Sequence, residues 1–349
     1  MDEIPTLDVI ATKSGFSKST VSLALRKHPR IPETTRKVIE RIAAEINYRP
    51  DPALARIAAN RWRRIPSQST LAFVTTNHPD GGLLDTETIK GARKRAEIFG
   101  YYVEHFRFED YGSAKRLGAA IYNRGIKGII LGKLCVEGFF EAFPWEKFAA
   151  VACDTGFIRP DLPMVMPDHA HAVHRAWAEA TAAGYRRIGL VLFGEVNAVD
   201  YFDKVSAYLY NQQFSRPGDR LAIHHLNTSD AASLADWVRR EKPDAILGFN
   251  GFVHYQLTQL GFSIPRDFGF IALMAGETPH QNLTRLRENI ELVAKIALDQ
   301  LDIFLRTNQY GRPKFSTTLM VEFEWIPGAT LPGPGPAKDR RQRSRSACH

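Results

Sequence analysis

Apolar residues recur at helical spacing through the N-terminal part of the chain. The pattern places one apolar face on each of the stretches 6–14, 17–25 and 32–48, and Gly15 interrupts the first of them. Hydroxyl side chains stand just before the first two stretches, where helix caps are expected. The sequence therefore predicts three short helices before residue 50.

From about residue 70 the pattern changes to short apolar runs that alternate with amphipathic helices. Examples are "TLAFVTT" followed by "TIKGARKRAEIFG" and "DAILGFN" followed by "VHYQLTQLG", and the series ends in a predicted strand at 317–325. This alternation is typical of parallel sheets with helices on both faces. About ten strands in about 260 residues suit two doubly wound lobes better than one. We therefore predict an α/β body behind a small all-α head.

The segments that flank this body have their own compositions. Residues 50–66 form a basic connector, in which "ALARIAANR" favours a helix of only about two turns, below the roughly 12–15 residues that an isolated helix needs. Residues 331–349 are rich in proline, glycine and arginine, a composition typical of disorder. We expect a helix-turn-helix head at 1–49, a hinge helix and linker at 50–66, a two-lobed body at 67–330 and a disordered basic tail at 331–349.

The positive charge of the chain is concentrated at its ends. The formal net charge is +8 at pH 7, and residues 1–66 carry +6 of it while residues 331–349 carry +4, so the middle is slightly negative. A basic head on a near-neutral body indicates a polyanion such as nucleic acid as the partner of the head. The three cysteines show no metal or disulfide spacing, and no apolar run is long enough to span a bilayer. We therefore expect a cytoplasmic protein without a membrane segment or a secretory signal.

Three residues of the head have the spacing of a helix-turn-helix. Ala11, Gly15 and Val21 stand as Ala-x3-Gly-x5-Val. In that motif a small residue lets the second helix cross closely, glycine takes a left-handed turn, and valine fills the gap between the helices. A generic three-helix bundle is the alternative, which the capping Ser17, the third amphipathic helix and the basic charge disfavour. Helix 17–25 then becomes a recognition helix that enters the major groove by its N-terminus.

With these residues the chain resembles the LacI/GalR family of bacterial transcription regulators. The resemblance is carried by "TLDVIATKSGFSKSTVSLAL" and "TTRKVIERIAAEINYRPDPALARIAA" near the N-terminus, and by "GYRRIGLVLF", "KPDAILGFN" and "LGFSIPRDFGFIAL" in the body. It covers about residues 6–327. The resemblance implies a homodimer with a periplasmic-binding-protein-like body, a near-palindromic DNA operator, a small-molecule effector between two lobes, and a hinge helix that orders on operator binding.

The candidate DNA contacts lie mainly in helix 17–25 and in the connector. We expect Lys18 and Ser19 to face base edges and Leu23 to offer an apolar contact such as one to a thymine methyl, while neighbouring hydroxyls donate to phosphates. The resemblance implies that Ile57 takes the place of a leucine that wedges a base step in the minor groove. Packing against its dimer mate is the alternative. The predicted DNA contacts are Thr6, Ser17, Lys18, Ser19, Thr20, Ser22, Leu23, Arg26, Arg30, Thr35, Tyr48, Arg56 and Ile57.

The candidates for an effector site follow from topology, because ligands of parallel sheets sit off the carboxyl ends of the strands. Compared with the family, Gly251 and Ala275–Gly276 stand where acids are common, and Lys204 stands near a common arginine. The polar groups that a sugar needs are therefore partly missing. A surface or capping role is the alternative for each candidate. The predicted effector residues are Thr76, Asn77, His78, Lys133, Asp154, Asp168, Lys204, Asn250 and Glu277.

No motif for catalysis is present, and the one histidine cluster is better explained without a metal. His169, His171 and His174 follow Asp168 closely, but capping or exposed histidines on an amphipathic helix account for them. We expect no metal, no cofactor and no enzyme activity. The sequence predicts a DNA-binding transcription regulator, a repressor controlled by a carbohydrate-related effector. A constitutive regulator with a degenerate effector pocket is the first alternative, and a soluble sugar-binding protein is the second.

Overall fold

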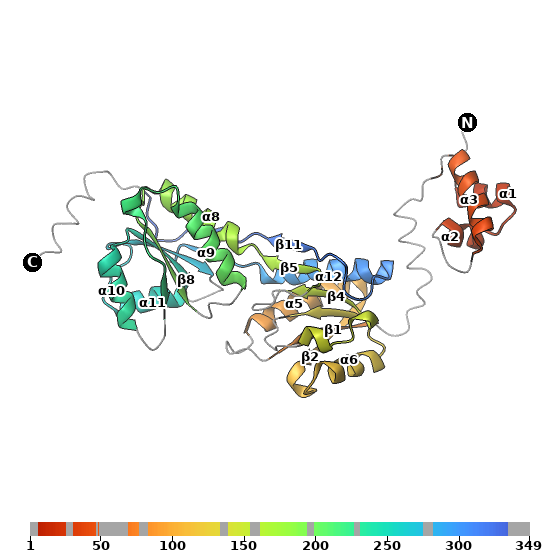
Figure 1. Cartoon of the computed structure of the whole chain (residues 1–349), viewed down its shortest axis with the longest axis horizontal. Helices are drawn as coiled ribbons and strands as arrows, with labels where there is room; N and C mark the ends of the chain where they lie inside the picture. The colour runs from red at the N-terminus through yellow and green to blue at the C-terminus, as the bar shows by residue number, and fades with distance from the viewer. Residues whose placement is uncertain are drawn as a thin grey trace, which may run out of the picture. The chain divides into compact units, whose positions relative to one another are not determined.

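The computed structural model divides the chain into two compact units, residues 1–67 and 68–349, which we call the head and the body (Figure 1). The structure describes residues 6–25, 31–46, 48, 69–76, 83–132, 139–153, 161–193, 199–226, 231–274 and 282–333. Within these residues no helix is long and apolar enough to cross a membrane.

The head consists of three helices, α1 (Leu7–Ser14), α2 (Lys18–Leu25) and α3 (Glu33–Glu45). The hydroxyl of Thr6 accepts from the backbone N–H of Val9 and so caps α1. Gly15 ends α1 in the left-handed region, with φ of 71°, and donates its N–H to the carbonyl of Ala11 at 3.0 Å. The helices enclose a small core, whose fully buried members are Ile10, Val21, Ala24 and Ile39.

Two six-stranded sheets form the body, one in each of two lobes. The sheet of the first lobe is entirely parallel, with the strand order β11 (Thr318–Val321), β5 (Met164–Pro167), β4 (Ala149–Cys153), β3 (Gly128–Leu131), β1 (Ser69–Thr75) and β2 (Tyr101–Arg107).

The sheet of the second lobe repeats this architecture with one antiparallel edge. Its order is β12 (Glu324–Ile326), β10 (Arg285–Arg287), β9 (Gly269–Met274), β8 (Ala245–Asn250), β6 (Ile188–Phe193) and β7 (His224–Leu226). Only β12 runs antiparallel to its neighbour β10. The predicted α/β class with two doubly wound lobes behind a helical head is confirmed.

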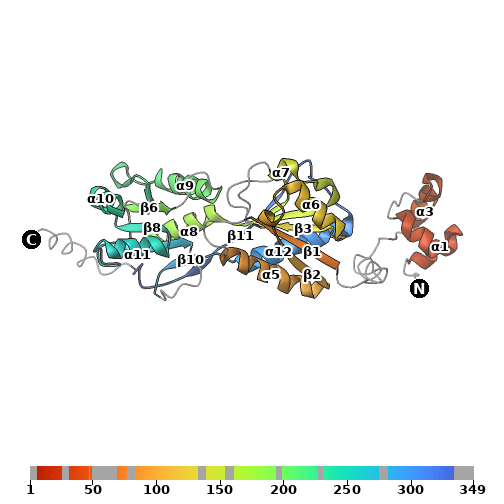
Figure 2. The same ribbon diagram turned by 90° about the horizontal axis from the view of Figure 1, so that it is seen from below.

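Helices cover both faces of each sheet (Figure 2). In the first lobe α5 (Leu83–Phe99) and α12 (Ile290–Thr307) pack side by side on one face, and α6 (Ala114–Asn123) and α7 (Phe139–Ala142) pack on the other. In the second lobe α8 (His169–Ala182) and α9 (Val199–Gln212) cover one face, and α10 (Ala231–Glu241) and α11 (Gly251–Gln259) the other. Three short 3-10 turns, Phe108–Asp110, Trp145–Lys147 and Pro217–Asp219, lie in the connections.

The chain passes three times between the two sheets. It leaves the first sheet after β5, returns from β10 to α12, and leaves again after β11. The last passage corrects the single strand expected at 317–325, because the segment divides at Glu322–Phe323 into β11 and β12, which belong to different sheets. The alternating pattern of this segment continues through the division, so it does not reveal the change of sheet.

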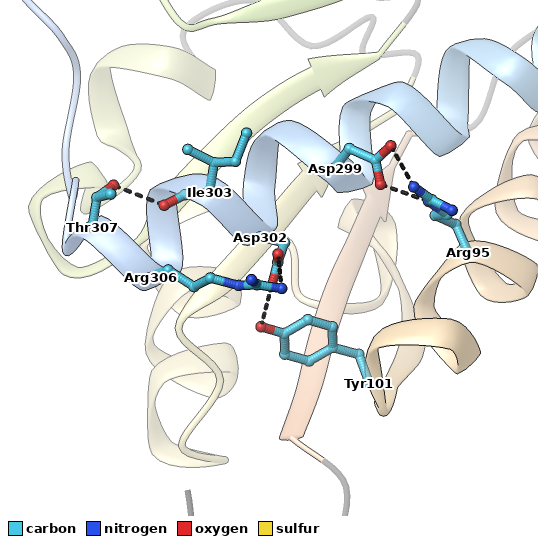
Figure 3. Close-up of polar contacts among 7 residues, drawn as sticks. All are labelled: Arg95, Tyr101, Asp299, Asp302, Ile303, Arg306 and Thr307. Carbon is cyan, nitrogen blue, oxygen red and sulfur yellow. Dashed lines mark hydrogen bonds and ion pairs between the residues drawn. The ribbon is translucent and has the colours of Figure 1, made fainter. Parts of the chain in front are cut away.

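A polar network fixes α12 to the first lobe (Figure 3). The guanidinium of Arg95 on α5 donates two hydrogen bonds to the carboxylate of Asp299, at 2.6 and 2.9 Å. One turn further along α12, the buried Asp302 accepts a 2.9 Å hydrogen bond from the hydroxyl of Tyr101 and pairs with Arg306. The helix that returns from the second lobe is therefore tied to both α5 and β2.

Candidate DNA-binding head and effector site

A network of hydroxyl groups occupies the N-terminus of α2. The Ser17 hydroxyl oxygen accepts from the backbone N–H of Thr20 at 3.2 Å and lies 2.8 Å from the Ser19 hydroxyl and 2.9 Å from the Thr20 hydroxyl. One oxygen therefore caps the helix and orders its neighbours. Ser17 and Ser19 are exposed, so the same groups remain open to an anion approaching the positive end of the helix.

The ammonium of Lys18 is held by an acid on the preceding helix. Lys18 Nζ lies 2.5 Å from Asp8 Oδ2, and both side chains are more than half exposed. A cation at a helix N-terminus is disfavoured by the helix dipole, so the carboxylate of α1 offsets this cost. Sequence reasoning missed Asp8, because its spacing from Lys18 becomes a contact only once the turn at Gly15 folds α2 back against α1.

The remaining predicted DNA contacts of the head fall into two groups. Ser22, Leu23 and Thr35 are half-buried on their helices. The N–H of Tyr48 donates to the carbonyl of Ala43 at 2.8 Å, and the Tyr48 ring packs against the head core. Those outside the described residues are Arg26, Arg30, Arg56 and Ile57.

Two of the predicted effector residues have capping roles in the body. Asp168 accepts from the N–H of His171 at 2.9 Å and caps α8. Asn250 accepts from the N–H of Phe252 at 3.0 Å and caps α11. Thr76, which directly follows β1, is buried. The effector candidates outside the described residues are Asn77, His78, Lys133, Asp154 and Glu277.

Lys204 on α9 is fully buried inside the second lobe. Its Nζ lies 3.2 Å from Nδ1 of His169 and 5.0 Å from the centroid of the Phe249 ring. These contacts compensate a charge that burial would otherwise disfavour. The cation that the sequence offered as a clamp for ligand hydroxyls is thus engaged by the protein itself.

The partners of Lys204 lie where the chain passes between the sheets. His169 follows the first passage, and its Nδ1 is 4.0 Å from Oε1 of Glu288, which lies at the second. Its ring meets that of Phe323, at the third passage, edge to face at 5.4 Å. His169, Glu288 and Phe323 were not predicted as a group, since each belongs to a different segment of the sequence. Among the described residues no three potential metal ligands come together.

Aromatic rings border the carboxyl ends of the second sheet. Phe193, at the end of β6, lies 6.4 Å from Phe249 on β8 and 5.4 Å from Phe252 at the start of α11, measured between ring centroids. All three rings are half-buried. This part of the predicted effector site therefore offers stacking surfaces beside the amide of Asn250.

Comparison with known proteins places the head and the fold of the body. Residues 6–51 match the model of the family described as bacterial regulatory proteins, lacI family. The "NTD biosynthesis operon regulator NtdR" of Bacillus subtilis (strain 168) is 26% identical over 189 residues, which are 53% of this chain and 54% of that protein. The match thus spans about half the length of this relative.

Solved structures share the fold at low sequence identity. A "transcriptional regulator CelR-cellobiose complex" aligns with a TM-score of 0.58 and 16% identity over 94% of this chain and 100% of that one. A lac repressor dimer bound to operator and the anti-inducer ONPF aligns with a TM-score of 0.57 and 17% identity over 94% and 99%. By its head the chain belongs to the lacI family of bacterial regulatory proteins, and its body has the fold of these structures.

Proposed function

We propose that this protein is a sequence-specific DNA-binding transcription regulator that acts in the cytoplasm as a dimeric repressor. The observation that carries the proposal is the exposed N-terminus of α2, with its hydroxyl network and Lys18, on a head of net charge +6. Helix dipole, N–H groups and hydroxyls suit phosphate oxygens, and a lysine at this end suits the acceptors of guanine in the major groove. One head would bind each half-site of a near-palindromic operator.

The body supplies a means of control. Its two sheets are joined by three chain passages, so a small molecule held between the lobes would change their relative orientation, and through the connector the spacing of the two heads of a dimer. A coupling free energy of roughly 1–3 kcal/mol is typical of such linkage. A structurally similar protein was solved with cellobiose, and this supports a carbohydrate-related effector for the proposed site.

A constitutive regulator is the second candidate, and one observation favours it. Lys204, the residue that would replace the usual arginine clamp, is enclosed by His169 and Phe249. If the site takes a ligand, recognition would then depend on Asn250, on the phenylalanine rings and on residues outside the described ranges.

Selection of binding sites from random duplexes tests the DNA-binding function. The full-length protein should enrich a near-palindromic motif, and Lys18→Ala should change the bases at paired positions of its half-sites. Lys37→Ala, which removes an exposed charge of the same head from α3, should weaken binding without changing the motif. Affinity for the selected duplex should fall steeply with salt. Failure to enrich any motif, with shallow salt dependence, would contradict the proposal and favour a sugar-binding protein.

A further inference from the structure

One edge of the first sheet is open and apolar. Within the described residues β11 pairs on one side only, with β5, and its Leu319 and Met320 side chains are 42% and 53% exposed. Phe315, three residues before the strand, is 78% exposed. In the register with β5, Leu319 lies beside Val165 and Met320 beside Met166, so both faces of the sheet continue to this edge as apolar surface.

The backbone of β11 alternates between its two neighbours. The carbonyls of Thr317 and Val321 accept from the N–H groups of Met164 and Asp168, at 2.8 and 2.9 Å. In a parallel ladder the residues between them direct their N–H and C=O groups to the opposite side. Thr318 and Met320 therefore present unused ladder positions at the open edge, which is a template for another strand.

The charges around this edge are arranged for one pairing register. Lys314 lies four residues before Thr318, and Glu322 lies four residues after it; Arg312 and Glu324 repeat the arrangement two residues further out. An antiparallel pair of two β11 strands centred on Thr318 sets Lys314 of each copy opposite Glu322 of the other. The same register sets Met320 opposite Ser316 and uses the outward-facing groups of Thr318 and Met320.

We propose that β11 pairs antiparallel with β11 of a second copy of this chain, which joins two first-lobe sheets into one continuous sheet. A two-fold contact requires a self-complementary surface, and the sequence basic–apolar–acidic along the strand meets this requirement. Edge strands are usually protected by charges placed within them, but here the charges stand at the two ends, where they attract a second copy. Glu324 already pairs with Arg287, so the contact between copies relies chiefly on Lys314 and Glu322.

The size of the surface sets the strength of the contact. A strand pair of this length buries far less than the roughly 1,200 Å² of a specific stable interface. Association through β11 is therefore weak, in about the micromolar range, and depends on protein concentration. The contact is independent of DNA binding by the head.

Sedimentation velocity of the full-length protein over a range of concentrations, up to about 100 μM, tests this contact. The wild type should show a concentration-dependent increase to a species of twice the mass. Lys314→Glu and Glu322→Lys should each reduce this association at least tenfold, because like charges then face each other. The double variant K314E/E322K should restore it, because each swapped charge again meets its opposite. Arg239→Glu, an equal charge change on exposed α10, should leave association unchanged.

A backbone variant tests the strand pairing itself. Thr318→Pro removes an N–H that points to the open edge and leaves the ladder with β5 intact; it should abolish the larger species while circular dichroism stays that of the wild type. The proposal is overturned if the wild type shows no larger species, if Thr318→Pro retains it, or if the double variant associates no better than the single ones.

Discussion

Lys204 and His169 hold each other inside the second lobe, with 3.2 Å between Nζ and Nδ1. The contact joins α9 to the first residue of α8, where the chain has just left the first lobe. Because His169 also approaches Glu288 and Phe323, a single buried cation is linked to all three passages between the sheets. The region that must deform when the lobes move is therefore organised around Lys204.

Lys204→Met keeps the length of the side chain and removes its charge. The buried Nδ1 of His169 then loses a hydrogen-bond donor, so the free energy of unfolding should fall by about 1–3 kcal/mol. Urea unfolding followed by circular dichroism measures the change. Lys115→Met, at an exposed position of α6, is the control and should change stability by less than about 0.5 kcal/mol. Equal stability of the two variants would show that the Lys204 contact contributes nothing.

Asp8→Asn releases Lys18 from its carboxylate partner and raises the charge of the DNA-facing surface by one. Nonspecific DNA should then bind more tightly, and the slope of log K against log salt should steepen by about 0.9. Fluorescence anisotropy with a random-sequence duplex at several salt concentrations measures both. In the double variant D8N/K18A the charge is again that of the wild type, and the slope should return to its original value. An unchanged slope in Asp8→Asn would mean that Asp8 does not neutralise Lys18 where DNA binds.

Local signals predicted much of the fold. Thr6 and Gly15 mark the ends of α1 in the sequence as they do in the structure, and the alternation of apolar runs and amphipathic helices indicated both sheets. These features depend on neighbouring residues, whose periodicity and turn preferences are visible in the chain itself.

Relationships between distant segments could not be predicted in the same way. The pattern of residues 317–325 is consistent with one strand, and only the positions of β5 and β10 determine that it divides between two sheets. The burial of Lys204 depends on His169 and Phe249, which lie 35 and 45 positions away along the chain. The sequence identified Lys204 as chemically important, but its surroundings follow from tertiary packing.

Asp302→Ala should weaken the attachment of α12 shown in Figure 3. The buried hydroxyl of Tyr101 loses its acceptor and Arg306 loses its ion pair, so the free energy of unfolding should fall by about 2–4 kcal/mol. Asp299→Ala is a matched control on the same helix, since its pair with Arg95 is about one-third exposed on both sides, and it should cost less than about 1 kcal/mol. Chemical denaturation of both variants provides the comparison, and equal losses would contradict a special role for the buried acid.

Glu291 should contribute to the acid sensitivity of the body. Hydrogen bonds from Lys295 and Lys94 hold the pKa of this carboxyl at about 2, below its ordinary value of 4.5. The folded state therefore binds the proton less readily than the unfolded state, so the contribution is fully present above pH 4.5 and is lost as the pH falls toward 2. Because the pair is partly exposed, it amounts to less than about 1 kcal/mol.

Glu291→Gln isolates this contribution. Thermal unfolding of wild type and variant between pH 6 and 3 should show the two melting temperatures converging as the pH falls, because only the wild type loses a pH-dependent interaction. Glu97→Gln, at an exposed position of α5, is the control and should keep a constant offset from the wild type across the same range. Parallel curves for wild type and Glu291→Gln would show that the lysines do not stabilise the ionised carboxylate, and that the link between α5 and α12 depends on Arg95, Tyr101 and their partners alone.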